Sequence, residues 1–253
     1  MAINDSTPAA PALDGHIILI TGASRGIGRA LALACADAGA TVIAAARNVR
    51  ALEALADDIT GRGRPPPLLL PINLQTASVD DYLGIAEHIE AQFGRLDGLV
   101  LGAAMLGDLT PLAHYDTVTW ARVFQVNVHS ALLLTQACWP LLLAAGRGSL
   151  IFTLAEEAYT AKANWGAYGV SKFALRGLFE TWARESAGNP AVRVNAVVPQ
   201  AVHTRLYMDA YPAADVDRLP APETVTDAYL HLLGAAGRAL NGTAVRAPLA
   251  RPD

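Results

Sequence analysis

The chain has 253 residues, of which 53% are hydrophobic and 17% are charged, and its formal net charge is −4. The charged share is below the usual value of about 25%, and a chain this long and apolar can bury a sizeable core, which excludes intrinsic disorder. Lys and Arg do not outnumber Asp and Glu, which argues against a partner such as nucleic acid. The two cysteines, Cys35 and Cys138, are too few and too far apart for a disulfide scaffold or a thiolate metal site. We expect both to be buried, reduced thiols, and we expect no metal.

Residues 1–11 are polar and contain several Ala and Pro, so we predict a flexible leader. They contain no basic segment followed by an apolar one, as a signal peptide would. The most apolar long segment, residues 131–145, is interrupted by polar side chains and is shorter than the roughly 20 residues that cross a bilayer. We therefore expect a cytoplasmic protein without a membrane partner.

After the leader, short apolar runs alternate with helical patterns. In chain order, the sequence predicts a strand at 16–21, a helix at 25–38, a strand at 41–46, a helix at 49–59, a strand at 68–72, a helix at 79–93 and a strand at 98–101. The second half continues with a helix at 116–143, a strand at 149–154, a helix at 167–186, a strand at 192–198, a polar and Pro-rich lid at 200–222, a helix at 223–236 and a strand at 243–247. This alternation predicts an α/β fold, a doubly wound parallel sheet of about seven strands with helices on both faces, formed by residues 12–253 as one domain.

The first predicted strand runs directly into a glycine-rich turn, Thr21-Gly22-Ala23-Ser24-Arg25-Gly26-Ile27-Gly28, and a helix follows. Glycines at such a junction permit a tight turn and let the backbone approach a pyrophosphate at the helix N-terminus, where free N–H groups and the helix dipole favour an anion. A plain strand–helix turn is the alternative. Because both flanking elements are predicted, the turn favours a dinucleotide site.

The spacing Gly-x-x-x-Gly-x-Gly with its preceding Thr resembles the signature of the short-chain dehydrogenase/reductases, of the type that reduces 3-oxoacyl groups on acyl carrier protein. The resemblance covers essentially the whole chain after the leader and implies one Rossmann-type domain that binds NAD or NADP. It also implies cofactor contacts from Gly22, Ser24, Arg25, Gly26, Ile27, Gly28, Arg47, Asn73, Leu74, Ala103, Tyr168, Lys172, Pro199 and Thr204.

The choice between the two cofactors depends on the end of the second predicted strand. Proteins that prefer NAD usually place an acid there to hold the adenine ribose. This strand ends in three alanines followed by Arg47, and Arg25 lies in the glycine turn. Two guanidinium groups could converge on a 2′-phosphate, since the planar fork of arginine suits phosphate. We expect NADP(H) to be preferred and NAD(H) to remain possible. The alternative is that both arginines are solvated surface charges.

Tyr168 and Lys172 are spaced i and i+4, so they share one face of a predicted helix. An ammonium beside a phenol favours the phenolate, so we expect a lowered tyrosine pKa. The alternative is an unrelated surface Lys beside a packing Tyr. In the resembling family the Tyr is the general acid/base and the Lys also holds the nicotinamide ribose. Asn127 matches the Asn that holds a water in that family's proton relay, and it could otherwise be an ordinary helix-interior Asn.

The sequence departs from the family pattern at the substrate end of the site. The family's carbonyl-binding Ser lies thirteen residues before the Tyr, and that position is Ala155. Loss of such a hydrogen-bond donor typically costs about 10²–10³ in rate. Thr153 and Glu156 are possible substitutes. Tyr207 gives the predicted lid an apolar character, which indicates either a substrate with hydrophobic bulk or a loop that is simply pinned to the body.

Taken with the resemblance, these residues favour an NADP(H)-dependent oxidoreductase that interconverts a small-molecule carbonyl and an alcohol by hydride transfer, with Tyr168 as the proton donor. Because Ala155 removes one member of the catalytic set, the alternative is a dinucleotide-binding redox sensor or scaffold with little turnover. Family members of this size form homodimers or homotetramers through their two long helices. The apolar residues at 131–145 and on the helix at 167–186 fit that arrangement, although core burial would look the same.

Overall fold

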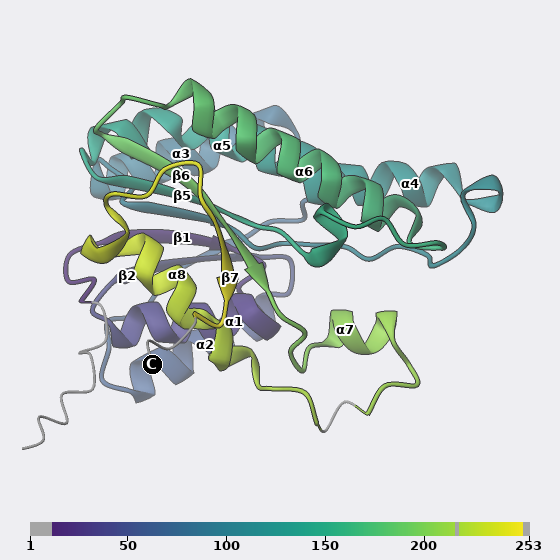
Figure 1. Ribbon diagram of the computed structural model, residues 1–253. Helices are drawn as coiled ribbons and strands as arrows, with labels where there is room; N and C mark the ends of the chain where they lie inside the picture. The colour runs from purple at the N-terminus through teal and green to yellow at the C-terminus, as the bar shows by residue number, and fades with distance from the viewer. Residues whose placement is uncertain (1–11, 216–217, 250–253) are drawn as a thin grey trace, which may run out of the picture.

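The computed structural model describes residues 12–215 and 218–249, so the expected leader at 1–11 lies outside the described residues. A seven-stranded, wholly parallel sheet runs through the molecule in the order β3-β2-β1-β4-β5-β6-β7 (Figure 1). The predicted fold class is confirmed. The strands are β1 (Ile17–Thr21), β2 (Thr41–Ala46), β3 (Leu68–Pro71), β4 (Gly98–Leu101), β5 (Gly148–Thr153), β6 (Val192–Pro199) and β7 (Ala244–Ala247).

Helices cover both faces of the sheet because alternate strand residues point to opposite sides. Ile18 and Ile20 of β1 belong to the core beneath α1 (Gly26–Asp37), α2 (Val49–Gly61) and α8 (Thr226–Leu233). Ile17 and Leu19 belong to the opposite core, beneath α3 (Val79–Phe93), α5 (Ser130–Ala144) and α6 (Gly166–Glu185). In Figure 1 these two sets form the lower and the upper helix layer. Both cysteines are free and buried in these cores, as expected, and burial raises the pKa of the Cys138 thiol to about 12.

The predicted helix at 116–143 is wrong in one respect, since it is not regular throughout. α4 (Thr117–Phe124) passes into a π-helical turn at Gln125–His129, and α5 follows directly. Asn127 lies in this turn, which is the kind of distortion that proteins often place at functional sites. Together the three segments form a helix, Thr117–Ala144, that is long and apolar enough to cross a membrane by length and composition alone. Core helices of water-soluble proteins can have this length and composition too. The α5 part packs against α3 and the sheet, so its apolar residues belong to the core of this fold.

The predicted lid contains a short helix, α7 (Arg205–Ala210), which Figure 1 shows set apart from both helix layers. The side chain of Thr204 begins α7 by accepting a hydrogen bond from the backbone N–H of Tyr207 at 3.3 Å. After the lid, the predicted helix at 223–236 consists of α8 with a 3₁₀ turn on each side. Arg193 of β6 donates to the carbonyls of the last residues of α8, Leu232 and Leu233, at 2.8 and 3.1 Å.

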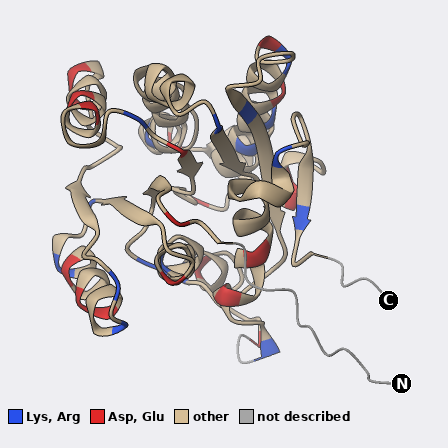
Figure 2. Cartoon of the chain, turned by 90° about the vertical axis from the view of Figure 1, so that its left-hand side faces the viewer, with Lys and Arg blue, Asp and Glu red and all other residues tan. Residues whose placement is uncertain are grey.

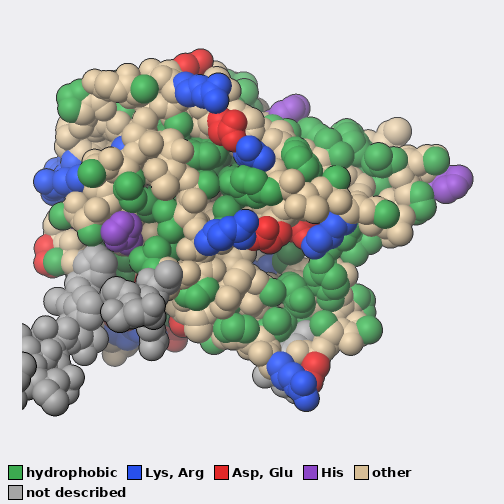
Figure 3. All heavy atoms as spheres, viewed as in Figure 1, with side chains coloured by type: hydrophobic (Ala, Val, Ile, Leu, Met, Phe, Trp, Pro, Cys, Tyr) green, Lys and Arg blue, Asp and Glu red, His purple; other side chains and the backbone are tan. Residues whose placement is uncertain are grey.

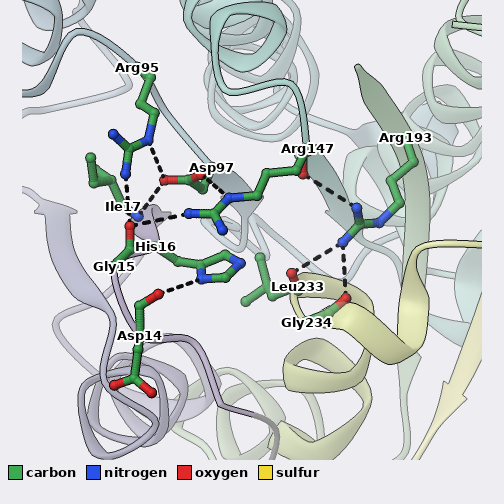
Figure 4. A network of polar contacts seen from close by, with 10 residues as sticks. All are labelled: Asp14, Gly15, His16, Ile17, Arg95, Asp97, Arg147, Arg193, Leu233 and Gly234. Atoms are coloured by element: carbon green, nitrogen blue, oxygen red, sulfur yellow. Dashed lines mark hydrogen bonds and ion pairs between the residues drawn. The ribbon is translucent and has the colours of Figure 1, made fainter. Parts of the chain in front are cut away.

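Charged residues of both signs are spread along the outer helices in Figure 2. The carboxylate of Asp97, by contrast, is buried. It lies at the start of β4, where the amino ends of the strands meet (Figure 4). It accepts hydrogen bonds from the backbone N–H of Ile17 at 2.9 Å and from Arg95 and Arg147 at 3.2 and 2.6 Å. One carboxylate thereby holds the starts of β1, β4 and β5 together, at the edge of the sheet opposite the carboxyl ends.

Replacing this carboxylate should destabilise the fold without touching the other edge of the sheet. We expect Asp97→Ala to lower the free energy of unfolding by about 2–4 kcal/mol, because it leaves the buried N–H of Ile17 without its acceptor and removes the carboxylate from two guanidinium groups, which keep only the carbonyl of Gly15. Asp37→Ala is the matched control, since Asp37 pairs with Arg62 on the surface and exposed pairs contribute about 0–1 kcal/mol. Urea denaturation measures both. Equal losses in the two variants would contradict this role for Asp97.

Candidate active site

A cleft of about 1160 Å³ opens along the carboxyl ends of the parallel strands. This is where open α/β sheets bind ligands, at the point where the strand order reverses between β1 and β4. Asn127 lies outside the lining of the cleft. The other predicted site residues all line it: Gly22, Ser24, Arg25, Gly26, Ile27, Gly28, Arg47, Asn73, Leu74, Ala103, Thr153, Ala155, Glu156, Tyr168, Lys172, Pro199, Thr204 and Tyr207.

The glycine turn is folded so tightly that side chains would not fit. Gly22 and Gly26 have φ angles of +74° and +54°, in the left-handed region that favours glycine. A Cβ on Gly28 would lie 2.3 Å from the carbonyl oxygen of Gly22. The side chain of the capping residue, Arg25, makes no hydrogen bond to the first N–H groups of α1, and residues 26–28 of that first turn line the cleft. This cradle fits the pyrophosphate of a dinucleotide.

Thr21 joins the two strand ends on which the cleft is built. Its hydroxyl donates to the carbonyl of Val100 at 3.3 Å and accepts from the backbone N–H groups of Gly102 and Ala103 at 3.0 and 3.2 Å. The segment after β4 is thereby drawn against the glycine turn, where a Cβ on Gly22 would come within 3.0 Å of the Cα of Ala103. The motif in the sequence includes Thr21 but does not predict these hydrogen bonds, which join segments about 80 residues apart.

Arg25 and Arg47 lie in the same half of the cleft, and both side chains are exposed. Within the described residues neither arginine forms an ion pair, so their charges are available to a ligand. Asn73 and Leu74 follow β3 and line the neighbouring wall, where the Asn73 side chain accepts from the N–H of Gln75 at 3.2 Å. The residues present fit a phosphorylated adenosine at this end.

Tyr168 and Lys172 meet in the middle of the cleft, both nearly buried in the first turns of α6. The Lys172 Nζ lies 5.5 Å from the Tyr168 ring centroid and donates to the backbone carbonyl of Thr153 at 3.0 Å. Burial lowers the pKa of Lys172 to about 8, against an opposing effect of Glu157. The expected lowering of the Tyr168 pKa is wrong for this structure: burial, assisted by Glu157 and Tyr211, raises that pKa above its usual value.

Asn127 clamps three segments together behind the wall of the cleft. Its Oδ1 accepts from the backbone N–H of Met105 at 2.7 Å, and its Nδ2 donates to the Met105 carbonyl at 3.0 Å and to the Ser171 hydroxyl at 2.9 Å. Ser171 lies between Tyr168 and Lys172 on α6. The side chain therefore positions the helix that carries both residues.

The end of β5 carries the three residues predicted to face the substrate. Ala155 lines the cleft in extended backbone conformation, and the Thr153 hydroxyl accepts a hydrogen bond at 3.2 Å from Tyr229, which is fully buried on α8. The Thr153 hydroxyl keeps its own proton to donate. Glu156 is exposed and pairs with Arg246 of β7.

The next residue, Glu157, turns inward and was missed by sequence reasoning. Its side chain is buried and accepts a hydrogen bond from Lys162 at 2.7 Å, and Trp165 and Tyr211 lie beside that lysine. All four line the cleft next to Tyr168. The sequence contains no signal for the inward turn, because the 3₁₀ turn after β5 decides which of two adjacent glutamates is buried.

Comparison with known proteins places the chain in a family. The family model for short chain dehydrogenases matches residues 16–215. The uncharacterized oxidoreductase YciK of Escherichia coli K12 is 37% identical over 235 residues, which are 93% of this chain and 92% of that protein. The 3-oxoacyl-[acyl-carrier-protein] reductase FabG of Thermotoga maritima is 32% identical over 192 residues, 76% of each chain.

The solved structures include a short-chain dehydrogenase of Escherichia coli CFT073 in complex with NADPH. It superimposes with a TM-score of 0.92 and is 37% identical, and the match covers 95% of this chain and all of that one. This chain belongs to the short-chain dehydrogenase family of oxidoreductases.

Proposed function

We propose that this oxidoreductase uses NADP(H) to interconvert a carbonyl and an alcohol on a small molecule. The observation that carries the proposal is the placement of Tyr168 and Lys172, side by side in a cleft whose far end presents a glycine cradle and two arginines. The related Escherichia coli CFT073 protein, in complex with NADPH, supports the choice of cofactor. When bound, the nicotinamide supplies or accepts the hydride.

Each part of the cleft has a task in binding that cofactor. The N–H groups at the start of α1 hold the pyrophosphate, and Arg25 and Arg47 donate charge-assisted hydrogen bonds to the 2′-phosphate. Lys172 would hold the nicotinamide ribose, and its hydrogen bond to the carbonyl of Thr153 orients it.

Tyr168 gives its phenolic proton to the carbonyl oxygen during reduction. Among the described residues none forms a hydrogen bond with its hydroxyl, which leaves that hydroxyl for the substrate. The phenol is protonated at neutral pH, as a proton donor requires, although its raised pKa makes it a weaker acid than an exposed tyrosine. With Ala155 in place of a donor, the Thr153 hydroxyl is the group at the end of β5 that can assist.

A dinucleotide-binding redox sensor or scaffold is the second candidate, and Ala155 is the observation that favours it. A methyl group cannot stabilise negative charge on the substrate oxygen. The preserved and buried Tyr168–Lys172 pair favours the enzyme, because burial of a lysine without use would cost stability for no gain.

The proposal extends to the setting of the protein. We place it in the cytoplasm and infer a homodimer or homotetramer that forms through the outer faces of α5 and α6. Trp139 of α5 and Trp182 of α6 are partly buried and pack on each other with ring centroids 4.6 Å apart, and Val170 and Phe173 of α6 are exposed. Burial of these side chains between subunits would remove apolar surface from water.

Turnover tests the enzyme directly. We expect the wild type to oxidise NADPH in the presence of at least one member of a panel of small aldehydes and ketones. Tyr168→Phe should abolish that turnover and leave NADPH binding intact, because only the proton donor is removed. Tyr159→Phe is the matched control, outside the lining of the cleft. Full activity of Tyr168→Phe on a confirmed substrate would show that the catalytic assignment is wrong.

Cofactor selectivity depends on the arginines. We expect the wild type to bind NADPH more tightly than NADH. Arg47→Leu should narrow the difference in binding free energy by about 1.5–3 kcal/mol, the contribution of a hydrogen bond to a charged group. Arg50→Leu, three residues further along the chain, is the control and should leave the difference in binding free energy between NADPH and NADH unchanged. Dissociation constants from fluorescence titration decide the matter, and a wild type that prefers NADH refutes the assignment.

The position of Ala155 tests what limits the rate. Ala155→Ser adds a donor at little steric cost and should raise kcat, by up to about one or two orders of magnitude. If Thr153 already assists, Thr153→Val should lower kcat and Ala155→Ser should change it little. Glu156→Gln should have no effect on kcat. Ala161→Ser controls for an added hydroxyl elsewhere in the loop. If all these variants and the wild type bind NADPH firmly and none turns over any carbonyl, the binding protein is the better description.

A further inference from the structure

The substrate end of the cleft contains an aromatic and carboxylate site that is filled by the chain's own ammonium group. Lys162 donates to Glu157 at 2.7 Å and to the Tyr211 hydroxyl at 3.2 Å. Its Nζ also lies 4.8 Å from the Trp165 ring centroid and 5.9 Å from that of Tyr211. Tyr211 thus meets the ammonium with its hydroxyl, and Trp165 meets it with its ring; a ring, a hydroxyl and a carboxylate around a cation suit an ammonium group.

The two partners of this ion pair differ in how firmly they are held. Glu157 belongs to the 3₁₀ turn after β5, which packs closely on α6, and its side chain is only 10% exposed. Lys162 belongs to the loop before α6, and its side chain is 39% exposed. The carboxylate is therefore fixed, whereas the lysine can turn into solvent. The cage, which we define as Glu157, Trp165 and Tyr211, would remain in place.

The site is continuous with the reacting centre. Trp165 belongs to the cage and also contacts the catalytic tyrosine, with its ring centroid 5.6 Å from that of Tyr211 and 5.7 Å from that of Tyr168. Tyr207 of α7 packs against Tyr211 at 4.7 Å and extends the apolar wall. In Figure 3 a row of basic and acidic side chains crosses the molecule between two apolar surfaces, the lower of which belongs to α7.

Charge decides which class of ligand suits this cage. A ligand ammonium would exchange with the Lys162 ammonium, so the buried carboxylate would stay paired while the lysine regains water. A ligand carboxylate would have to share one lysine with Glu157, at the cost of bringing two negative charges together in a partly dry site. A neutral ligand that displaced the lysine would leave Glu157 unpaired. Exchange of one cation for another is the least costly of the three.

We propose that the substrate carries a protonated amine on an apolar or aromatic body, and that Glu157, Trp165 and Tyr211 hold the amine while Lys162 is its placeholder. This inference rests on the proposed function, since it places the carbonyl of the same molecule at Tyr168. An anchored amine fixes the position of the carbonyl. Binding energy from the remote amine then helps to orient the carbonyl at the reacting centre. This gain in rate offsets part of the rate that is lost because Ala155 provides no hydrogen-bond donor.

Binding of small probes tests the cage without any turnover. Isothermal titration calorimetry compares benzylammonium, benzyl alcohol and benzoate on the full chain at pH 7, with and without NADP⁺. The wild type should bind benzylammonium most tightly and benzoate least tightly. Lys162→Met removes the placeholder, so it should strengthen benzylammonium binding at least tenfold and leave benzyl alcohol nearly unchanged. Adding Glu157→Gln to that variant should abolish the preference.

A matched control exists outside the cleft. Arg176 pairs with Glu180 and lies over the ring of Tyr159, so it repeats the set of carboxylate, cation and aromatic ring on the outer part of α6. Glu180→Gln should leave all three probe affinities as they are. Should the Glu157 variant fail to fold by circular dichroism, Tyr211→Leu in the Lys162→Met background tests the same cage, with an expected loss of the gained affinity.

The outcomes separate this inference from the proposed function. Equal affinities for the three probes, tighter binding of benzoate, or no gain in Lys162→Met would each overturn the ammonium site, whether or not the protein reduces carbonyls. Conversely, a clear ammonium preference in a protein that turns over no carbonyl would retain the site and reject the enzyme.

Discussion

Where β1 and β4 end, the chain leaves the sheet in opposite directions, and the hydroxyl of Thr21 satisfies backbone groups that the strand ladder no longer pairs. It bonds to one carbonyl and two N–H groups of the β4 strand and the segment after it. α1 then packs below the sheet, whereas the segment after β4 leads to α4 and α5 above it. A cleft must open between two such crossovers. Every group assigned to the cofactor or substrate depends on that opening.

The fold also excludes water from the part of the cleft that holds Tyr168 and Lys172. Tyr168 and Lys172 are almost fully buried, so each is pushed towards its neutral form: the pKa of the phenol rises and that of the lysine falls to about 8. The i and i+4 spacing of the two residues alone predicts a lowered, not a raised, pKa for the tyrosine. Burial has the largest effect on the Tyr168 pKa, and the Lys172 Nζ, 5.5 Å from the centroid of the Tyr168 ring, forms no hydrogen bond with the phenol in the described residues.

The sequence predicted the parts of the site that local spacing determines. Gly22, Gly26 and Gly28 lie within a single turn, and Tyr168 and Lys172 on one helix face, so their relations follow from the chain itself. Contacts between distant segments could not be predicted in this way. The π-helical turn is held by hydrogen bonds from Asn127 to residues 22 and 44 positions away. The partner of Thr153 comes from α8, 76 residues later.

The inward turn of Glu157 links the substrate end of the cleft to the chemistry at its centre. Its negative charge raises the pKa of both Tyr168 and Lys172, and so favours the protonated form of each. Lys162 partly offsets that charge while it occupies the cage. A substrate ammonium in the cage places the same positive charge beside Glu157 as Lys162 does. The pKa of the Tyr168 phenol therefore stays the same when the complex forms, and the phenol remains a proton donor. A neutral substrate that displaced Lys162 would remove the offset and raise the Tyr168 pKa further, which makes proton transfer to the carbonyl less favourable. The same carboxylate can therefore select the substrate and keep the electrostatics of the reacting centre constant during binding.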